Sequence, residues 1–489
     1  MKAVKFAARH MKKSFIISLL PIILILLLIP KILVLSGCAT IVPPQGGFRD
    51  SLPPVLIKAN PKDSALNFRN NRITFSFDEF VELQNVQQNL IITPIPQNNP
   101  TVEARLNTVT LRLKDSLETN TTYTINFGDA IQDINEKNVL KNFTYRFSTG
   151  PAMDSLRLSG KVILAETGRP DTTLIVMLHK NGKDSAVMSE KPRYITRLNQ
   201  KGEFTFQSLP AATYYLYAVA APSGSYSYFG RDQLFAFADK PVVTQQKNDS
   251  IILYAFAEKK EEIKKATTTP PVGGGRKLPG VSGADKRLKY QTSLKDNKQD
   301  LLENFSFKFE TPLKYFDSTK IYFSTDTGYI AVTEPFHWMI DSTKTKAELK
   351  TVWKENTTYN LIFDTDFAED TMGRRILKKD TISFSTRQKV SYGELKINFK
   401  NINLTKNPVL QFIQNNTVVL SAPLTTNQYA SSLFNPGDYE LRILFDENKN
   451  GIWDPGEFFG KRKQPELVKP IERRLTVKPS WQNEFDITL

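Results

Sequence analysis

Apolar and polar residues alternate through much of the chain with the period of a β-strand. The segments 73–78, 109–114, 123–127 and 143–147 each carry a large apolar side chain at every second position. Successive side chains of a strand point to opposite faces, so each segment has one face suited to a core. Turn-forming Asn, Asp and Pro residues separate the segments, as is typical of antiparallel β-sandwiches. The predicted fold class is therefore all-β.

Two sequence motifs recur later in the chain with nearly equal spacing. The motif at 120–125 returns at 356–361, an offset of 236 residues. The Phe-Ser-Thr motif at 147–149 returns at 384–386, an offset of 237 residues. Two separate motifs with matching offsets indicate an internal duplication of one sandwich domain.

The predicted domain organisation follows from this repeat and from changes in composition. A second kind of sandwich is predicted after each copy, because residues 434–441 match the turn and strand at 209–216. A charge run and a stretch rich in Thr, Pro and Gly separate the halves and indicate a flexible linker. The chain would thus be an array of tandem antiparallel β-sandwiches, ordered A-B-linker-A-B like beads on a string. The predicted bounds are a tether at 38–51, domains at 52–150 and 153–257, a linker at 258–287, and domains at 288–387 and 390–489.

The N-terminus has the layout of a secretory signal. Two lysines precede an almost wholly apolar run at 15–29, and a second short apolar run follows Lys31. Charge, apolar core and a small-residue cleavage site in this order predict a signal peptide at 1–37. The alternative is a single uncleaved transmembrane anchor helix, which would have to bury Lys31 or let it snorkel. Both Met1 and Met11 are candidates for the true start.

The apolar run ends in Leu35-Ser36-Gly37-Cys38, and Cys38 is the only cysteine of the chain. This ending resembles the bacterial lipobox. The resemblance implies that Cys38 is diacylated, with palmitate as a typical chain, that the preceding peptide is removed, and that the new amine is acylated. Three acyl chains exceed the two signals needed for stable anchoring, so lipid alone would hold the protein at a membrane.

Two families resemble the predicted domains. Asn60-Pro61 and the strand motif at 73–79 resemble the bacterial Ig-like domain named after the surface-layer protein SbsA, and Asp133 and Asn138 retain part of its Asp-x-x-Gly-Asn loop. The Gly-x-Phe-x-Phe strand at 202–206 resembles the carboxypeptidase-regulatory-like, or prealbumin-like, sandwich. Both resemblances imply non-catalytic modules outside the cytoplasm. An array of this kind is similar to lipoproteins of Bacteroidetes-type bacteria.

The residues after Cys38 bear on where such a lipoprotein would reside. Ala39, rather than Asp, follows the cysteine and is compatible with sorting to the outer membrane. Residues 39–45 lack the acidic cluster associated with surface export in Bacteroidetes-type bacteria. We therefore expect an outer-membrane lipoprotein of the cell envelope, with the periplasmic face slightly favoured over the cell surface.

Charge and histidine content narrow the classes of function. The formal net charge is +15, and six of the cations precede Cys38. The positive charge that remains after Cys38 favours solubility or contact with anionic surfaces such as lipid headgroups. No nucleic-acid module is found in the sequence. Of three histidines, His10 lies in the signal, and His179 and His337 lie in different domains. Neither a zinc site nor a Ser-His-Asp triad is expected, so the protein is predicted not to be an enzyme.

One loop of the last domain matches a calcium-binding pattern. Residues 446–457 place oxygen-bearing side chains at positions 1, 3, 5, 9 and 12 of a twelve-residue loop, with Gly at position 6. Strand-like sequence flanks the loop, so it would close a hairpin, and an Asx- and Gly-rich β-turn without metal is the alternative. The predicted Ca²⁺ ligands are Asp446, Asn448, Asn450, the Ile452 carbonyl, Asp454 and Glu457.

These features predict a non-catalytic cell-envelope lipoprotein that acts as a structural or binding module. Its predicted partners are the membrane, through the lipid anchor, and an envelope protein or a glycan, but no nucleic acid. Two alternatives stay open. Aromatic residues between Tyr214 and Phe229 could stack on a sugar in a surface adhesin. The acid pairs Asp78-Glu79 and Glu369-Asp370 could serve an unrecognised hydrolase site.

Overall fold

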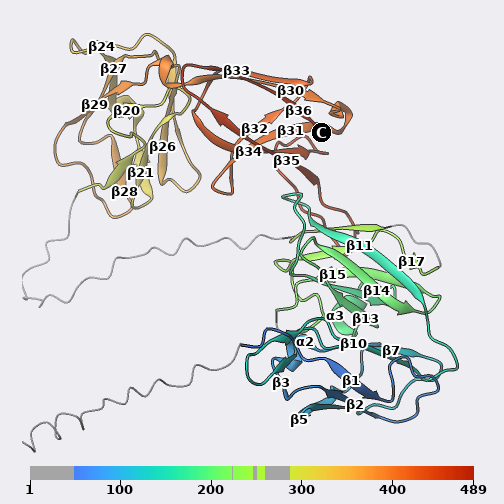
Figure 1. Cartoon of the computed structure of the whole chain (residues 1–489). Coiled ribbons are helices and arrows are strands. Elements are labelled where there is room, and N and C mark those ends of the chain that lie inside the picture. The colour runs from blue at the N-terminus through green and yellow to red at the C-terminus, as the bar shows by residue number, and fades with distance from the viewer. Residues whose placement is uncertain (1–48, 223, 246–249, 259–286) are drawn as a thin grey trace, which may run out of the picture.

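The computed structural model of the chain describes residues 49–222, 224–245, 250–258 and 287–489. These residues form predominantly antiparallel sheets, which confirms the all-β class, and the sheets lie in four groups that follow one another along the chain (Figure 1). We name them domain 1 (50–150), domain 2 (153–257), domain 3 (288–387) and domain 4 (390–489). In space, domain 4 lies between domains 2 and 3, so the order along the molecule differs from the order along the chain (Figure 1).

Domain 1 is built from strands with the predicted alternation. In β2 (Arg72–Phe77), Ile73, Phe75 and Phe77 are fully buried, and half-buried residues separate them. One sheet has the order β1-β2-β6-β5, the facing sheet has the order β10-β7-β4, and a small sheet has the order β3-β8-β9. The other elements are β1 (Leu56–Asn60), β3 (Val81–Leu83), α2 (Val86–Asn89), β4 (Ile91–Thr93), β5 (Thr101–Arg105), β6 (Thr108–Arg112), β7 (Thr122–Asn126), β8 (Ile131–Asp133), β9 (Val139–Leu140) and β10 (Thr144–Ser148).

Domain 3 repeats the topology of domain 1. Its sheet β19-β21-β26-β25 corresponds to β1-β2-β6-β5, and its strands β29-β27-β23 correspond to β10-β7-β4, with β20 and β24 added at the edges. The elements are β19 (Tyr290–Thr292), β20 (Lys298–Gln299), β21 (Phe305–Phe309), β22 (Leu313–Phe316), η1 (Ser318–Lys320), β23 (Ile321–Thr325), β24 (Ile330–Ala331), β25 (Phe336–Ile340), β26 (Lys346–Thr351), β27 (Thr358–Phe363), β28 (Ala368–Asp370) and β29 (Asp380–Thr386).

Domains 1 and 3 also share a hydrogen-bond arrangement next to their last strands. The Thr149 hydroxyl donates to the Glu118 carbonyl at 2.6 Å, and the Thr386 hydroxyl donates to the Lys354 carbonyl at 2.5 Å. Both threonines lie at the end of the Phe-Ser-Thr motif that the sequence repeats. The motif therefore recurs because its hydroxyl ties the last strand to the turn before β7 or β27.

Domains 2 and 4 are a second matching pair. Their sheets have the orders β14-β11-β18 and β13-β12-β15-β16 in domain 2, and β33-β30-β36 and β32-β31-β34-β35 in domain 4. In both domains the first and last strands pair in parallel. The elements are β11 (Leu156–Leu164), β12 (Ile175–His179), α3 (Ala186–Ser189), β13 (Tyr194–Arg197), β14 (Glu203–Leu209), β15 (Thr213–Val219), β16 (Phe235–Phe237), β17 (Val242–Val243), β18 (Ile251–Ala255), η2 (Lys389–Ser391), β30 (Gly393–Lys400), η3 (Leu404–Lys406), β31 (Pro408–Gln414), β32 (Thr417–Pro423), β33 (Gln428–Phe434), β34 (Gly437–Phe445), β35 (Leu467–Val477) and β36 (Gln482–Thr488).

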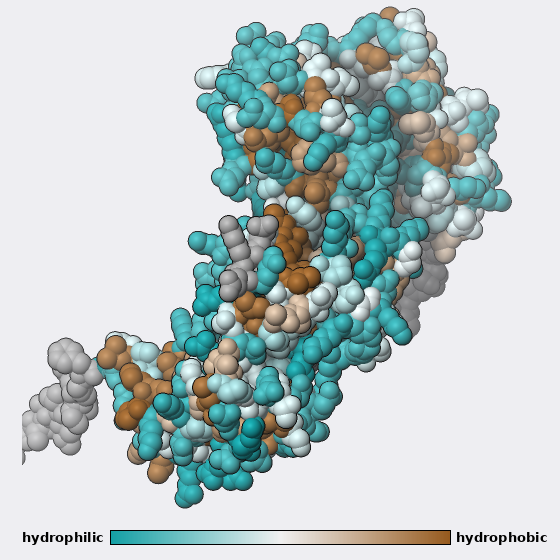
Figure 2. Space-filling model, turned by 90° about the vertical axis from the view of Figure 1, so that its right-hand side faces the viewer, coloured by the Kyte–Doolittle hydropathy of each residue, from teal (hydrophilic) through white to brown (hydrophobic). Residues whose placement is uncertain are grey.

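Domain 4 packs directly on domain 2, although about 130 residues separate the ends of these domains in the chain. The Val468 amide donates to the Ala165 carbonyl at 3.1 Å, and Arg442 donates to the Glu166 carbonyl at 2.8 Å. Hydrophobic side chains gather near the middle of the face shown in Figure 2, and a groove of about 710 Å³ is lined by residues of both domains. The expected beads-on-a-string arrangement is thus wrong for this pair of domains.

Candidate functional site

The predicted calcium loop connects β34 to β35 in domain 4. Asp446 directly follows β34, and only 1% of its surface is exposed. Its carboxylate accepts hydrogen bonds from the amides of Lys449 (2.6 Å), Gly451 (2.6 Å) and Asn450 (3.2 Å). Gly451 has a positive φ of 77°, a conformation that favours glycine. Asp446 therefore closes the loop around its own backbone.

The other predicted ligands fall into two groups. The side-chain amides of Asn448 and Asn450 both donate to Asp454 Oδ2, at 2.5 and 2.7 Å. Glu457, at the twelfth position, instead forms an ion pair with Lys461 at 2.8 Å. The structure therefore brings Asn448, Asn450 and Asp454 together but directs Glu457 toward a lysine.

A further carboxylate, which the sequence pattern missed, belongs to this loop. Glu466 is 3% exposed and accepts the amides of Glu447 (2.8 Å) and Asp454 (3.0 Å). Burial raises the pKa of Glu466, and the nearby charges of Asp446 and Asp454 raise it further. Glu466 lies outside the twelve-residue window. An acid between Pro465 and Leu467, just before a strand, is the only sequence signal that could have pointed to it.

The described part of the chain contains no group of three or more His, Cys, Asp or Glu side chains placed to hold a metal ion. In the loop, hydrogen bonds already engage Asp446, Asp454 and Glu466. A calcium ion would need these oxygens to turn toward a common centre. Calcium binding at this loop therefore stays a prediction.

The same loop continues into a contact with domain 2. Phe458 is fully buried, with its ring centroid 5.0 Å from that of Phe235 and 5.1 Å from that of Phe237. Arg462 donates to Asp184 at 2.9 Å and to the Tyr217 hydroxyl at 3.2 Å. The loop thus places an aromatic anchor and a charged anchor on another domain.

Several aromatic residues of domain 2 form this contact surface, and others belong to the internal core of the domain. Tyr214, Tyr217 and Tyr228 are each at most 1% exposed, and the Tyr228 ring stacks on Phe459 of domain 4 at 5.7 Å. Phe229 alone remains largely exposed, at 66%. The proposed sugar-stacking role is therefore wrong for these three tyrosines, because domain 4 and the domain 2 core cover their rings.

The acid pair in domain 3 is part of the framework. Glu369 pairs with Lys314 at 3.1 Å and with Arg375 at 2.5 Å. Asp370 is fully buried and bonds to Thr311 and Arg374, both at 2.7 Å. Burial alone would raise the pKa of Asp370, but these hydrogen bonds outweigh it and lower the pKa to about 2. Both carboxylates are held as anions by structural contacts, which is unsuited to a general acid.

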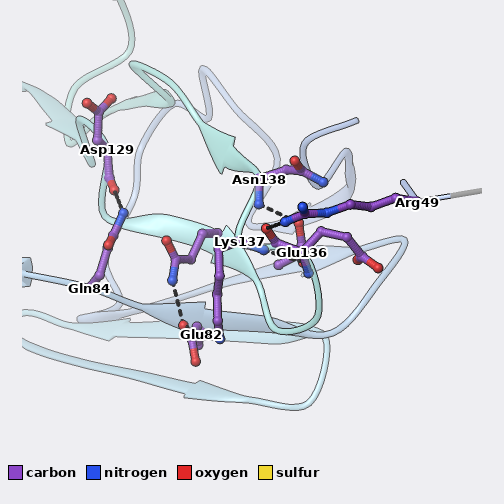
Figure 3. Close-up of polar contacts among 9 residues, drawn as sticks. Arg49, Glu82, Gln84, Asp129, Glu136, Lys137 and Asn138 are labelled. Atoms are coloured by element: carbon purple, nitrogen blue, oxygen red, sulfur yellow. Dashed lines mark hydrogen bonds and ion pairs between the residues drawn. The ribbon is translucent and has the colours of Figure 1, made fainter. Parts of the chain in front are cut away.

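Asp133 is the equivalent of Asp370 in domain 1. It is fully buried and accepts the amides of Glu136 (2.6 Å), Lys137 (3.0 Å) and Asn138 (2.7 Å). Figure 3 shows the surrounding contacts, in which Lys137 pairs with Glu82 at 2.8 Å. The partly retained family motif thus folds a loop around a buried carboxylate.

The two histidines of the domains differ in environment. His179 is 1% exposed, and its Nε2 atom has no hydrogen-bond partner. Burial lowers its pKa to about 4. His337 lies exposed on β25 of domain 3. Neither histidine is placed with the acids described above.

The predicted lipidation site belongs to the N-terminal segment of the sequence. Cys38, the signal peptide at 1–37 and most of the tether lie outside the described residues. Among the described residues, no helix is long and apolar enough to cross a membrane.

Comparison with known proteins identifies the class of the first domain. Residues 50–149 match the model of a bacterial Ig-like domain. This match covers domain 1, and domain 3 repeats its topology. No curated protein matches the chain.

Solved structures give weaker likenesses. The TIE protein of Bacillus anthracis is 11% identical over 91% of this chain and 75% of its own, with a TM-score of 0.17. The N-terminal part of the bacterial S-layer protein SbsC is 16% identical over 40% of this chain and 44% of its own, with a TM-score of 0.16. BcpA, the major pilin subunit of Bacillus cereus, is 11% identical over 68% of this chain and 98% of its own, also at 0.16. TM-scores this low do not indicate a common arrangement of domains.

Proposed function

We propose that this protein is a non-catalytic structural or binding module of the bacterial cell envelope, held at a membrane by acylated Cys38. The Ig-like match of domain 1 supports the structural class. The outer membrane is the proposed site, with the periplasmic face slightly favoured over the cell surface.

The contact between domains 2 and 4 is the observation that carries this proposal. Phe458, Arg462 and Gln464 of one loop bond to or pack on domain 2, with Gln464 donating to Asp239 at 2.6 Å. A buried aromatic anchor surrounded by polar contacts is the usual anatomy of a specific interface. This contact fixes the relative position of two domains that are far apart in sequence. A module that carries load or acts as a spacer needs such rigidity.

The contacts of the buried polar side chains support a role without catalysis. Glu369 and Asp370 are paired with cations, and Asp133 with backbone amides. His179 is buried, and its Nε2 atom has no hydrogen-bond partner among the described residues. A catalytic acid or base needs a reactive pKa and access to a substrate. These groups instead hold loops and cores together.

The anchor can be tested through the mass and location of the protein in its host. We expect the mature protein to begin at Cys38 and to carry the mass of three acyl chains. Cys38→Ala should leave an unprocessed precursor without added lipid, whereas Ser36→Ala should still be processed. A mature protein of unmodified mass, or one that retains residues 1–37, would exclude the lipoprotein. Protease treatment of whole cells would then decide which face the domains occupy.

A further inference from the structure

The edge strand β25 of domain 3 is unusually open to pairing. It ends the sheet β19-β21-β26-β25, and no strand of the described residues pairs with its outer side. Its sequence, Phe-His-Trp-Met-Ile, has no charge, and Phe336, Met339 and Ile340 are 39%, 40% and 41% exposed. Edge strands are normally protected by charges, prolines or bulges, because their free backbone groups can pair with another chain. Domain 3 also lies at one end of the molecule (Figure 1).

The duplicated domain shows what such protection looks like in this protein. The equivalent edge of domain 1 is β5, with the sequence Thr-Val-Glu-Ala-Arg. Glu103 and Arg105 of β5 are both exposed. β25 occupies the same place in the sheet without either charge. The edge strand of domain 1 therefore carries exposed charges that disfavour pairing with another strand, whereas the edge strand of domain 3 carries none.

The register of β25 fixes which of its backbone groups are free. The Asp341 amide donates to the Lys346 carbonyl at 3.1 Å, so the pair 341–346 is hydrogen-bonded. Bonded and non-bonded pairs alternate in an antiparallel ladder. Met339 and His337 therefore bond to β26. Phe336, Trp338 and Ile340 point their amides and carbonyls outward.

We propose that β25 pairs with β25 of a second copy of this chain, antiparallel and about a two-fold axis at Trp338. In that register Trp338 meets Trp338 of the other copy, and Phe336 meets Ile340. Each outward amide and carbonyl then finds a partner, and the two four-stranded sheets become one. Such an isologous contact closes on itself, so the product is a dimer.

The charges around β25 are compatible with this pairing. Beyond the strand, the register sets Asp341 opposite Pro335 and Glu334 opposite Ser342. Like charges directly opposite one another would destabilise the pair, and this register has none. On the outer face, His337 lies opposite Met339. A small interface of this kind predicts weak association.

The oligomeric state of the full chain in detergent tests the proposal. Sedimentation velocity over a range of concentrations should show a monomer–dimer equilibrium. Ile340→Pro removes an outward amide that β26 does not use, and should weaken dimerisation at least about tenfold. Met339→Lys adds a charge to an exposed position and should have the same effect. Val352→Lys is the matched control, because Val352 is 78% exposed but lies outside the paired strand, and its dimer should persist.

Cross-linking tests the register itself. A His337→Cys/Met339→Cys double variant places cysteines opposite each other in the two copies, and should give a covalent dimer on oxidation. Met339→Cys alone, which faces His337 of the other copy, should give little. A monomer at all concentrations would overturn the proposal. So would a dimer that survives both Ile340→Pro and Met339→Lys, or cross-linking of the single variant as efficient as that of the double.

Discussion

The two halves of the chain have the same domain topologies but join their domains differently. In the first half, domain 1 packs closely on domain 2, where Arg193 forms an ion pair with Glu118 and its carbonyl accepts the Ile95 amide at 3.0 Å. In the second half, the Leu301 amide of domain 3 donates to the Tyr392 hydroxyl of domain 4 at 2.7 Å, and an open groove of about 630 Å³ is lined by residues of both domains. The duplication has therefore kept the cores while the surfaces between domains have diverged.

A second difference lies in the loop after the fifth strand of domains 2 and 4. In domain 2, the short segment between β15 and β16 carries Tyr228, which is buried in the contact surface. In domain 4, the longer segment between β34 and β35 carries Asp446, Phe458 and Glu466. The domain 2 loop supplies one ring of the receiving surface, beside Phe235 and Phe237 of β16, and the domain 4 loop supplies the inserted side chains. The equivalent loops of domains 2 and 4 therefore lie on opposite sides of one contact.

Among the variants considered, truncation of Phe458, the aromatic anchor of domain 4, should have the largest effect on the contact between domains 2 and 4. Phe458→Ala should weaken the docking of domain 4 on domain 2 by about 3–5 kcal/mol, the usual cost of truncating a buried phenylalanine. The radius of gyration from small-angle scattering should increase, and the unfolding transitions of the halves should separate. Phe229→Ala is the control, because Phe229 is 66% exposed beside the same surface and should change neither quantity. An unchanged scattering profile in Phe458→Ala would show that the polar contacts suffice.

The strands could be predicted from sequence, but the docking of domain 4 could not. Ile73, Phe75 and Phe77 are buried as their alternation predicts, because period-two patterning reports which face of a strand meets the core. Phe458 has the same local pattern as a core residue, and nothing in the neighbouring sequence shows that it packs on Phe235 and Phe237, which lie far earlier in the chain. Glu466 escaped detection for a related reason, since its partners are backbone amides rather than a spaced motif.

The buried aspartates of domains 1 and 3 test whether equivalent positions carry equal energy. Asp370→Asn should destabilise domain 3 by about 3 kcal/mol, because it weakens charge-assisted bonds to Arg374 in a buried site. Asp133→Asn should cost domain 1 less, about 2 kcal/mol, because the Asp133 carboxylate accepts hydrogen bonds from backbone amides rather than from a charged side chain. Chemical denaturation of each variant measures both values. Equal losses would show that the ion pair with Arg374 adds nothing.

Acid should reduce the stability of domain 3, because protonation of Asp370 weakens the same buried contacts. Its pKa is about 2 in the folded state, against an ordinary value of 3.8. The folded pKa is the lower one, so its stabilisation is present above pH 4 and is lost as the pH falls from about 4 to about 2. The shift corresponds to about 2 kcal/mol. Asp370→Asn should remove this pH dependence from the unfolding of domain 3.

Calcium should have the smallest effect of these changes, a slight stabilisation of domain 4 without an equivalent in domain 2. If the 446–457 loop binds Ca²⁺ with the millimolar to submillimolar affinity of extracellular modules, 1 mM Ca²⁺ would stabilise domain 4 by at most about 1.4 kcal/mol. Asp454→Asn and Glu457→Gln should each abolish this gain while preserving side-chain shape. Asp446 is unsuitable for this test, because its carboxylate closes the loop whether or not an ion is present.

Glu447→Gln is the matched control for calcium, since Glu447 lies in the loop but outside the predicted ligand set. Its Ca²⁺-dependent stabilisation should equal that of the native chain. Isothermal titration of the full chain should give one site per molecule, because the corresponding segment of domain 2, Ala221-Pro222-Ser223-Gly224-Ser225, has no carboxylate. Absence of heat and of any thermal shift in the native chain would leave the loop as a metal-free turn. Its buried carboxylates would then serve the contact with domain 2 by fixing the path of the chain toward Phe458.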